Sequence, residues 1–280
     1  MTFNTAQALD KRVSYSVILT FQALAVLFAI LIAPVTGIGQ AAQSQGKVIP
    51  KLMNGKPDLG GVWDRPRVAD VTKDVKGCRY PELTLADGVG CSSKVSGEVS
   101  YTPWGLEQWK QWKVDQYDYT AHCLPKGYTR SLQMAMYPVE ILHTPTRLAI
   151  LMEADFNFKV IPTDGRKHSP DYDASWLGES VGRYEGETLV VDTTGFNGQT
   201  WIDASEHLSS DQLHVVQRFR LIDANHLEYE VTFEDPKMYT KPFKNTQIWV
   251  RMKPSVELLE FVCNENNKDL VEGLHPDTKK

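Results

Sequence analysis

Alternating apolar and polar positions run through the second half of the chain and predict antiparallel β-strands. The two longest such segments, residues 213–222 and 226–234, flank the loop Asp223-Ala224-Asn225. A three-residue loop sets one register, in which charged side chains meet on one face and apolar side chains meet on the other. The predicted pairs are Arg220 with Glu228, Arg218 with Glu230, His214 with Glu234, Leu221 with Leu227, Phe219 with Tyr229, and Val215 with Phe233. Gln217 is the exception, a polar side chain on the apolar face opposite Val231, so we expect it to bond to a neighbour or to line a cavity.

A second hairpin is predicted around Glu185-Gly186, because glycine adopts the positive φ that a tight turn needs. Residues 176–184 and 187–193 form its two strands. The two-residue loop pairs Arg183 with Thr188, Val181 with Val190, Glu179 with Asp192, Gly182 with Leu189, Ser180 with Val191, and Gly178 with Thr193. Glycines within a strand indicate the close approach of another backbone or of a ligand.

Shorter alternating segments complete the expected set of strands. They cover residues 136–143, 147–153, 156–161, 246–252 and 257–263, and Gly61-Val62-Trp63 opens the first strand. Strands and helices do not alternate regularly along the chain, which argues against a parallel sheet. A closed or nearly closed barrel best protects the edges of about nine or ten antiparallel strands. We therefore predict an all-β fold, an antiparallel β-barrel with one main helix.

That helix is expected over residues 103–117. Thr102 offers an N-cap hydroxyl, and Pro103 suits the first helical position. Large apolar side chains at helical spacing follow, namely Trp104, Leu106, Trp109 and Trp112. We interpret this stripe as a packing surface, because aromatic side chains at such spacing usually pack against a core.

The N-terminal region has a different composition from the rest. Lys11 and Arg12 precede an apolar run from Val17 to Val35, and small residues follow it. This order is typical of a secretory signal peptide, although the run also approaches the length of a membrane anchor. We expect residues 1–41 to be a signal peptide or anchor, 42–57 a flexible leader, and 58–272 a single barrel domain. The protein would then be exported to the periplasm or the exterior, and would meet a membrane only through an uncleaved N-terminal segment.

The net charge and the cysteine content indicate which partners and which covalent cross-links to expect. The net charge of −5 is spread along the chain and argues against a nucleic-acid partner, whose binding surfaces are basic. An even number of cysteines in an exported protein indicates disulfides. We expect Cys78 to pair with Cys91 across a short glycine-rich loop, and Cys123 to pair with Cys263.

Several motifs together carry a family resemblance. They are PDLGGVW at 57–63, CLP at 123–125, TDGRKH at 163–168, WLGESVGRYEGETLVVDTTGFN at 176–197, EDPKMYTKP at 234–242 and LEFVCNEN at 259–266. The combination resembles a family of exported bacterial β-rich proteins with no established activity. The start Gly61-Val62-Trp63 is similar to that of lipocalin-type barrels, which implies a lipocalin- or calycin-like fold. Relatives often read His-Pro-His-Ser where this chain has His207-Leu208-Ser209-Ser210, and losing the second histidine weakens any two-histidine metal site.

The loop after the second hairpin holds the first candidate site. Asp203 and His207 follow Trp201, and a histidine beside a carboxylate can act as a general acid or base with a fixed tautomer. The alternative is a surface loop whose histidine only caps a neighbour. Trp201 and Asn197 would contribute contacts to a substrate.

A second candidate lies around Asp164-Gly165, which is first of all a turn. Arg166 and His168 follow the turn and could face a substrate anion. If Glu179 and Asp192 lie directly opposite each other, repulsion between their charges would raise the pKa of one of the two carboxyl groups, which would suit acid–base catalysis. Arg183 on the same face could equally neutralise them, and we favour that structural interpretation.

Two further motifs carry less weight. GESVG at 178–182 matches the serine nucleophile elbow around Ser180, with Asp203 and His207 following in the order of a serine hydrolase. The elbow requires a strand-to-helix turn, whereas a hairpin strand is predicted here. Asp171, Asp173 and His168 form only a poor calcium pattern, and neither a zinc motif nor a nucleotide loop is recognisable, so we expect no metal and no cofactor.

Two functions therefore remain open. The first is a cofactor-free enzyme, a lyase, isomerase or hydrolase, acting on a small, largely apolar molecule through His207, Asp203 and His168. The second is a non-catalytic lipocalin-like carrier of such a molecule. We expect Trp201, Asp203 and His207 to meet at one mouth of the barrel, near Ser180 or Gln217, with Arg166 and His168 touching the same ligand. Convergence of these side chains would favour catalysis, and scatter would favour binding.

Overall fold

The computed structural model describes residues 48–85, 89–115, 118–134, 136–154, 157–265 and 267. The predicted signal peptide and the first part of the predicted leader lie outside these residues. The described end of the leader, residues 48–57, contacts the second hairpin, where the Lys51 Nζ lies 3.3 Å from a carboxylate oxygen of Glu187. Nearby, the Lys56 Nζ donates a hydrogen bond of 3.4 Å to the carbonyl of Gly186.

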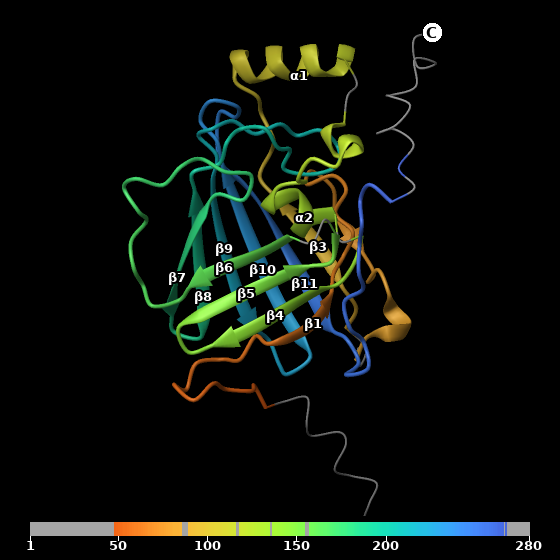
Figure 1. Cartoon of the computed structure of the whole chain (residues 1–280), viewed down its shortest axis with the longest axis vertical. Coiled ribbons are helices and arrows are strands. Elements are labelled where there is room, and N and C mark those ends of the chain that lie inside the picture. Colours follow the sequence, from red (N-terminus) through yellow and green to blue (C-terminus); the bar gives the residue numbers. More distant parts are fainter. Residues whose placement is uncertain are drawn as a thin grey trace, which may run out of the picture. The chain divides into compact units, whose positions relative to one another are not determined.

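Nine antiparallel strands follow one another around a nearly closed barrel, as predicted (Figure 1). They run in the order β6 (Asn157–Pro162), β5 (Arg147–Met152), β4 (Val139–Thr144), β1 (Gly61–Asp64), β11 (Phe243–Arg251), β10 (His226–Glu234), β9 (His214–Leu221), β8 (Thr188–Thr194) and β7 (Glu179–Glu185). Two short strands lie off this path: β3 (Ser92–Ser96) pairs with β11, and β2 (Val75–Lys76) pairs with β3. In Figure 1, β4, β5 and β6 cross in front of the long strands β7 to β11.

The first and last strands are joined through Trp63. Its ring lies 4.3 Å from the guanidinium carbon of Arg251, its register partner in β11. The Arg251 guanidinium also donates to the carbonyls of Gly60 and Ala224. Gly61 has a φ of 129°, and a Cβ there would lie 2.1 Å from the Arg251 Nη1. The glycine before Trp63 is therefore required, because it leaves room for the arginine to stack on the indole.

The barrel is incompletely closed between β6 and β7. The described residues show no strand ladder there, and the nearest backbone bond comes after the end of β6, where Gly165 donates its N–H to the Gly182 carbonyl of β7 at 3.1 Å. A Cβ on Gly182 would lie 3.1 Å from the Pro162 carbonyl oxygen. Of the two causes predicted for glycines in this strand, Gly182 therefore shows the close approach of another backbone.

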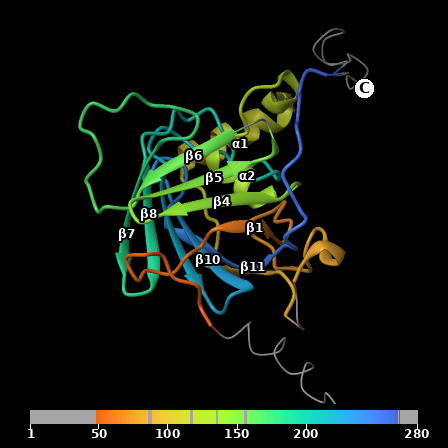
Figure 2. The ribbon, with the colours of Figure 1, turned by 60° about the horizontal axis from the view of Figure 1, so that its bottom comes forward.

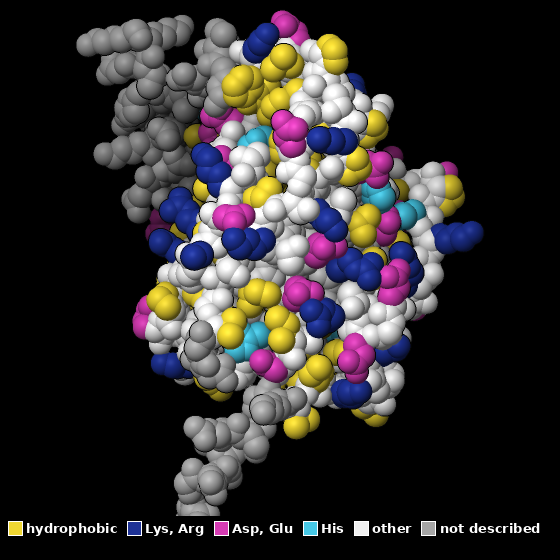
Figure 3. Space-filling view, turned by 180° about the vertical axis from the view of Figure 1, so that it is seen from behind, with side chains coloured by type: hydrophobic (Ala, Val, Ile, Leu, Met, Phe, Trp, Pro, Cys, Tyr) yellow, Lys and Arg dark blue, Asp and Glu magenta, His cyan; other side chains and the backbone are white. Residues whose placement is uncertain are grey.

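The β9–β10 hairpin has the predicted register at every position. Arg220 faces Glu228, Arg218 faces Glu230, and Gln217 faces Val231 inside the barrel. Gln217 is only 1% exposed and donates to the Tyr229 hydroxyl at 2.8 Å, so it bonds to a neighbour as expected. On the outer face of this sheet, acidic and basic side chains are interspersed (Figure 3).

The predicted register of the β7–β8 hairpin is wrong by two residues, although the faces are right. Glu179 pairs with Thr194, and Asp192 pairs with Val181. The turn lies one residue later than predicted, at Gly186-Glu187, with Gly186 at a φ of 64°. A glycine with positive φ at the first central position is the pattern of a type II′ turn, so Gly186 opens the turn and does not end it.

The described residues form two α-helices, the predicted main helix and a second, short one. The predicted helix is α1 (Pro103–Asp115), and the Thr102 hydroxyl caps it by accepting a 2.9 Å bond from the N–H of Gly105. The short helix α2 (Tyr128–Met134) was missed, because its seven residues are nearly all buried and display no polar face. Figure 2 shows α2 at the end of the strands β4 and β5. The strand predicted at 257–263 is wrong, since this segment is irregular in the structure.

Large side chains fill the barrel interior. Trp63, Phe219, Tyr229 and Trp249 are each at most 1% exposed. The ring centroids of Tyr229 and Trp249 lie 4.7 Å apart, and those of Phe219 and Tyr229 lie 5.0 Å apart. Because these side chains occupy the interior, we expect a ligand to bind at the ends or sides of the barrel.

Candidate functional site

The Asp203–His207 pair lies on a small turn that follows β8. Ile202 donates to the His207 carbonyl at 2.7 Å, and the two residues begin and end the turn. Glu206, just before the histidine, has a φ of 65°, which is uncommon for a residue with a side chain. The turn brings the Asp203 Oδ2 to 2.7 Å from the His207 Nδ1, as the sequence predicted.

Asp203 is fully buried and its carboxylate is saturated with hydrogen bonds. Besides the imidazole, it accepts from the backbone N–H groups of Val71 at 2.7 Å, Ser205 at 2.9 Å and His207 at 3.3 Å. When the His207 Nδ1 donates to this carboxylate, the tautomer leaves Nε2 without a proton and able to accept one. The His207 side chain is 12% exposed, so the pair has the geometry of an oriented base.

Asp70 lies close to this pair. Single ligand atoms of Asp70, Asp203 and His207 all lie within 4.8 Å of one another, a spacing that a metal ion would need. Burial by itself would raise the pKa of Asp70, but hydrogen bonds from Thr72 and Lys73 hold that pKa below its usual value. Because protein donors already occupy both carboxylates, we describe the cluster as a hydrogen-bonded one.

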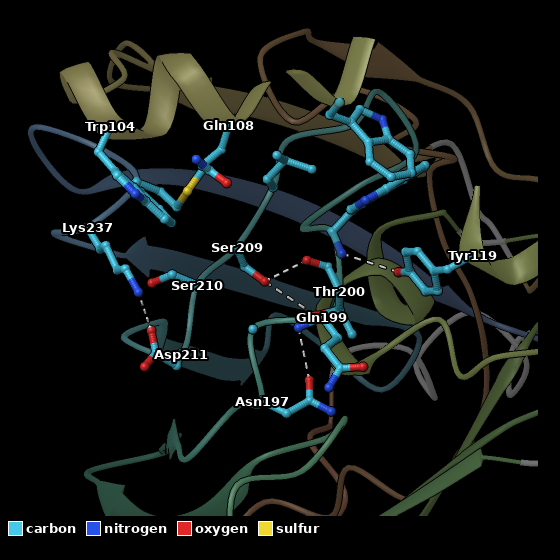
Figure 4. Close-up of a pocket in the computed structure, with 15 residues that line it drawn as sticks. Trp104, Gln108, Tyr119, Asn197, Gln199, Thr200, Ser209, Ser210, Asp211 and Lys237 are labelled. Carbon is cyan, nitrogen blue, oxygen red and sulfur yellow. Dashed lines mark hydrogen bonds and ion pairs between the residues drawn. The ribbon is translucent and has the colours of Figure 1, made fainter. Parts of the chain in front are cut away.

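Trp201 and Asn197 lie on a separate feature, a cleft of about 480 Å³ beneath α1 (Figure 4). Trp104, Gln108 and Trp112 of α1 form one wall of this cleft. The opposite wall comes from the loops after β8 and β10 and consists of Asn197, Gly198, Gln199, Thr200, Trp201, Leu208, Ser209, Ser210, Asp211, Lys237 and Met238, and Tyr119 also lines the cleft. His207 is not among the lining residues, although the next residue, Leu208, is.

Aromatic and charged side chains hold the cleft together. Trp201 is 4% exposed and packs edge-to-face against Trp112, with ring centroids 4.9 Å apart. The guanidinium carbon of Arg130 lies 4.4 Å from the Trp201 ring centroid. At the other end, the Lys237 Nζ lies 4.7 Å from the Trp104 ring centroid and 3.1 Å from an Asp211 carboxylate oxygen. Trp104 is 43% exposed, so part of its side chain is accessible.

The predicted packing role of the α1 stripe is confirmed for Trp109 and Trp112, whose rings pack against Tyr101 and Trp201, whereas Trp104 is largely exposed. Among the α1 residues whose burial is described, Gly105 is the buried one, and a Cβ there would lie 2.3 Å from the Met238 carbonyl oxygen. Trp104, Gln108 and Trp112 are spaced by four residues and share one helical face. That spacing is the signal by which Gln108 could have been found from the sequence, whereas Asp211 and Lys237 carry no such signal.

His168 lies elsewhere, on the outer face of the barrel wall. Its Nδ1 is 3.0 Å from the Glu179 carboxylate, and its Nε2 is 2.9 Å from that of Asp192. The other Asp192 oxygen is 3.1 Å from the His214 Nε2, and the His214 Nδ1 is 3.4 Å from Glu234. Histidines and carboxylates thus alternate along one chain of five side chains.

This chain corrects the prediction for the two carboxylates. The hydrogen bond to His214 holds the pKa of Asp192 below its usual value, aided by His168 and opposed by burial. The hydrogen bond to Asp192 raises the pKa of His214. Histidines, and not Arg183, compensate the carboxylates, because Arg183 pairs with Glu185 at 2.9 Å.

The other predicted site residues lie apart from the Asp203–His207 pair. The Ser180 hydroxyl bonds to the Thr193 hydroxyl at 2.7 Å within the barrel wall, so the described structure contains no triad with His207. Gln217 is inside the barrel, and Arg166 forms an exposed ion pair with Asp164 at 2.6 Å. The structure therefore brings Asp203 to His207 and Trp201 to Asn197, and it does not bring all the candidates to one mouth.

Both predicted disulfides are present. Cys78 and Cys91 have Cα atoms 4.6 Å apart, and Cys123 and Cys263 have Cα atoms 5.6 Å apart. The second bond ties the segment before α2 to the irregular C-terminal segment.

No helix among the described residues combines the length and the apolar character needed to cross a membrane. No family model, curated protein or solved structure matches the chain.

Proposed function

We propose that the protein binds a small amphipathic ring compound in the cleft beneath α1. The observation that carries the proposal is the exposed indole of Trp104, which faces a cleft edged by hydrogen-bonding side chains. Ligand sites typically combine aromatic walls with a few polar groups that fix the orientation of the ligand. Here Trp104 and Trp112 supply the aromatic walls.

The polar groups of the cleft narrow the ligand class. Amide side chains at Gln108, Asn197 and Gln199 can both donate and accept hydrogen bonds. The Asp211–Lys237 ion pair adds an anionic acceptor and a cationic donor at the edge. A ring that stacks on indole and carries hydroxyl groups at its edge, such as a sugar or a phenol, satisfies both kinds of group. This ligand is more polar than the largely apolar molecule expected from the sequence.

Substitution of Trp104 by alanine tests the proposal. Small molecules that co-purify with the wild-type protein would be identified by mass spectrometry, and their binding measured by calorimetry. We expect Trp104→Ala to weaken binding about tenfold, equivalent to a lost aromatic contact of about 1.4 kcal/mol. The thermal midpoint should fall only slightly, because Trp104 is 43% exposed and lies outside the barrel core.

The matched control is Leu142→Ala, which removes an exposed apolar side chain from β4. It should leave both binding and stability as in the wild type. Equal affinities of the wild type and Trp104→Ala for the co-purifying ligand would refute the cleft as the binding site.

The Asp203–His207 pair supports a second candidate, a cofactor-free enzyme that uses His207 as general base. A buried carboxylate at 2.7 Å orients the imidazole, and Leu208 places the neighbouring position of the chain in the cleft. We expect His207→Ala to abolish turnover of a ligand identified as above while its binding persists. Turnover unchanged in His207→Ala would exclude the base, and the binding proposal would stand independently.

We also propose that the protein is exported. Its two disulfides are compatible with an oxidising compartment. Expression of the full chain followed by N-terminal sequencing of the secreted or periplasmic fraction tests this. We expect a new N-terminus close to residue 42, and recovery of only the intact chain from the reducing cytosol would contradict export.

A further inference from the structure

A second cavity, of about 420 Å³, lies at the incomplete closure of the barrel. Its walls come from β6 and from the segment that leads into β7, at the place where these two strands diverge. Asn157, Lys159, Val160, Tyr172, Trp176 and Leu177 are among the lining residues. The cavity combines two aromatic rings and two aliphatic side chains with a single amine.

Lys159 joins the two edges of this opening. Its side chain is buried, with the residue only 6% exposed. The Nζ donates to the carbonyl of Leu177 at 2.8 Å and to the carbonyl of Gly178. The Nζ also lies over the ring of Tyr128, 5.5 Å from the ring centroid. A lysine amine thus occupies the place where strand hydrogen bonds would otherwise close the barrel.

The surroundings of this amine raise the fraction that is neutral near pH 7. Burial lowers the pKa of Lys159 to about 8, and Glu179 is the nearby charge that opposes this shift. A neutral amine has two N–H bonds and one lone pair. With both N–H groups donated to the Leu177 and Gly178 carbonyls, the lone pair is the direction left over for reaction. Amines desolvated in this way are nucleophiles towards carbonyl compounds.

We propose that Lys159 forms a reversible imine with a small apolar aldehyde or ketone held in this cavity. The Nζ lone pair attacks the carbonyl carbon and the C=O π bond breaks. A proton moves from nitrogen to oxygen, which gives a carbinolamine. Protonation of its hydroxyl releases water and leaves an iminium whose remaining N–H can donate to the Gly178 carbonyl. The reaction consumes a neutral amine, a carbonyl and one proton from the solvent, produces an iminium and water, and requires no oxidant or reductant.

Tyr172 supplies a hydroxyl beside the reacting nitrogen. Its oxygen donates to the same Gly178 carbonyl at 2.9 Å and lies 2.8 Å from the Ser175 hydroxyl. Because the Gly178 carbonyl accepts from both Tyr172 and Lys159, the phenol and the amine are held side by side. When the Tyr172 O–H turns away from the Gly178 carbonyl, it can donate instead to the carbonyl oxygen of the ligand or to the departing hydroxyl.

Reductive trapping with benzaldehyde tests the proposal. The protein, with both disulfides intact, is incubated at pH 7 with benzaldehyde and cyanoborohydride, which reduces each imine to a stable benzylamine. Peptide mapping then gives a rate for every lysine. With a pKa of about 8, about one tenth of the Lys159 amine is neutral at pH 7, against about one part in 2,500 for an ordinary lysine. We expect Lys159 to be modified at least tenfold faster than Lys73, whose side chain is 75% exposed.

Two substitutions separate reactivity from structure. Lys159→Arg keeps donors for the two carbonyls but forms no imine, so it should lose the fast phase of labelling and retain the thermal midpoint. Lys73→Arg is the matched control and should keep that phase. A Lys159 labelled no faster than Lys73 in the folded wild type would overturn the proposal. So would a fast phase that persists in Lys159→Arg.

Discussion

Replacing the buried Asp203 by asparagine changes the shape of the side chain very little and its hydrogen bonding completely. In the folded protein, Oδ2 accepts from the Val71 N–H and from the His207 Nδ1, both at 2.7 Å. Oδ1 accepts from the backbone N–H groups of Ser205 and His207. An asparagine has only one acceptor oxygen, and its amide nitrogen is itself a donor. Either orientation of the amide therefore sets a donor against at least one buried backbone N–H.

The expected loss of stability follows from these contacts. A buried backbone donor left unsatisfied costs about 1–3 kcal/mol, and a lost hydrogen bond to a charged group costs about 1.5–3 kcal/mol. Asp203 is fully buried, so solvent does not replace the missing acceptor. We therefore expect Asp203→Asn to lower the free energy of unfolding by about 3 to 5 kcal/mol.

Urea unfolding followed by tryptophan fluorescence measures this difference, with linear extrapolation to zero denaturant. Asp211→Asn is the matched control, because the Asp211 side chain is 62% exposed and its ion pair with Lys237 should be worth less than about 1 kcal/mol. If Asp203→Asn and Asp211→Asn have the same free energy of unfolding, the carboxylate does not hold this turn and the reasoning fails.

Three further predictions concern other parts of the barrel. Replacing both Cys123 and Cys263, which are separated by 140 residues, with serine should lower the free energy of unfolding by about 5 kcal/mol in the chain-entropy model. Urea unfolding measures this loss, and a loss below about 1 kcal/mol would show that the disulfide does not stabilise the fold by constraining the unfolded chain. The raised pKa of His214 gives stability that is present below the unfolded histidine pKa of about 6.5 and lost as the pH rises through the folded value. The lowered pKa of Asp192 gives stability that is present above about pH 4 and lost as the pH falls through its folded value. The urea midpoint of His214→Gln should thus fall furthest below that of the wild type between about pH 4 and 6.5, and a pH-independent difference would refute the pairing. Gly182→Ala should destabilise the protein by about 1–3 kcal/mol, because its Cβ would lie 3.1 Å from a β6 carbonyl oxygen. An unchanged thermal midpoint would show that the space between β6 and β7 accommodates a methyl group without strain.

The barrel class and the β9–β10 register could be predicted because, apart from Val216 and Gln217, polar and apolar side chains alternate along both strands. Only one register places the basic side chains of β9 opposite the acidic side chains of β10, and it pairs Arg218 with Glu230. The β7–β8 hairpin lacks this constraint, because a shift of two residues keeps every side chain on its face. Only the turn decides between the two registers, and Gly186 suits the first central position as well as the second.

The candidate site was predictable only where its residues are close in sequence. Asp203 and His207 are four residues apart on one turn, so a local pattern reveals them. Lys237, in contrast, reaches the cleft through a loop after β10, and a single sequence does not indicate which loops meet at the end of a barrel. Lys159 was overlooked for another reason: it occupies an inward position of a strand, where alternation predicts an apolar residue.

The contact between Arg251 and the start of β1 joins two segments that are far apart in the sequence. Its guanidinium bonds to the Gly60 carbonyl across 191 positions of the chain, and β1 completes its second edge only when β11 is present. Pairings between such distant segments form late, because the entropy of closing the loop precedes any gain from the contacts. A ribosome must therefore release residue 251 before the barrel can close. Until then β1 lacks its β11 neighbour, and the emerging polypeptide cannot complete the barrel.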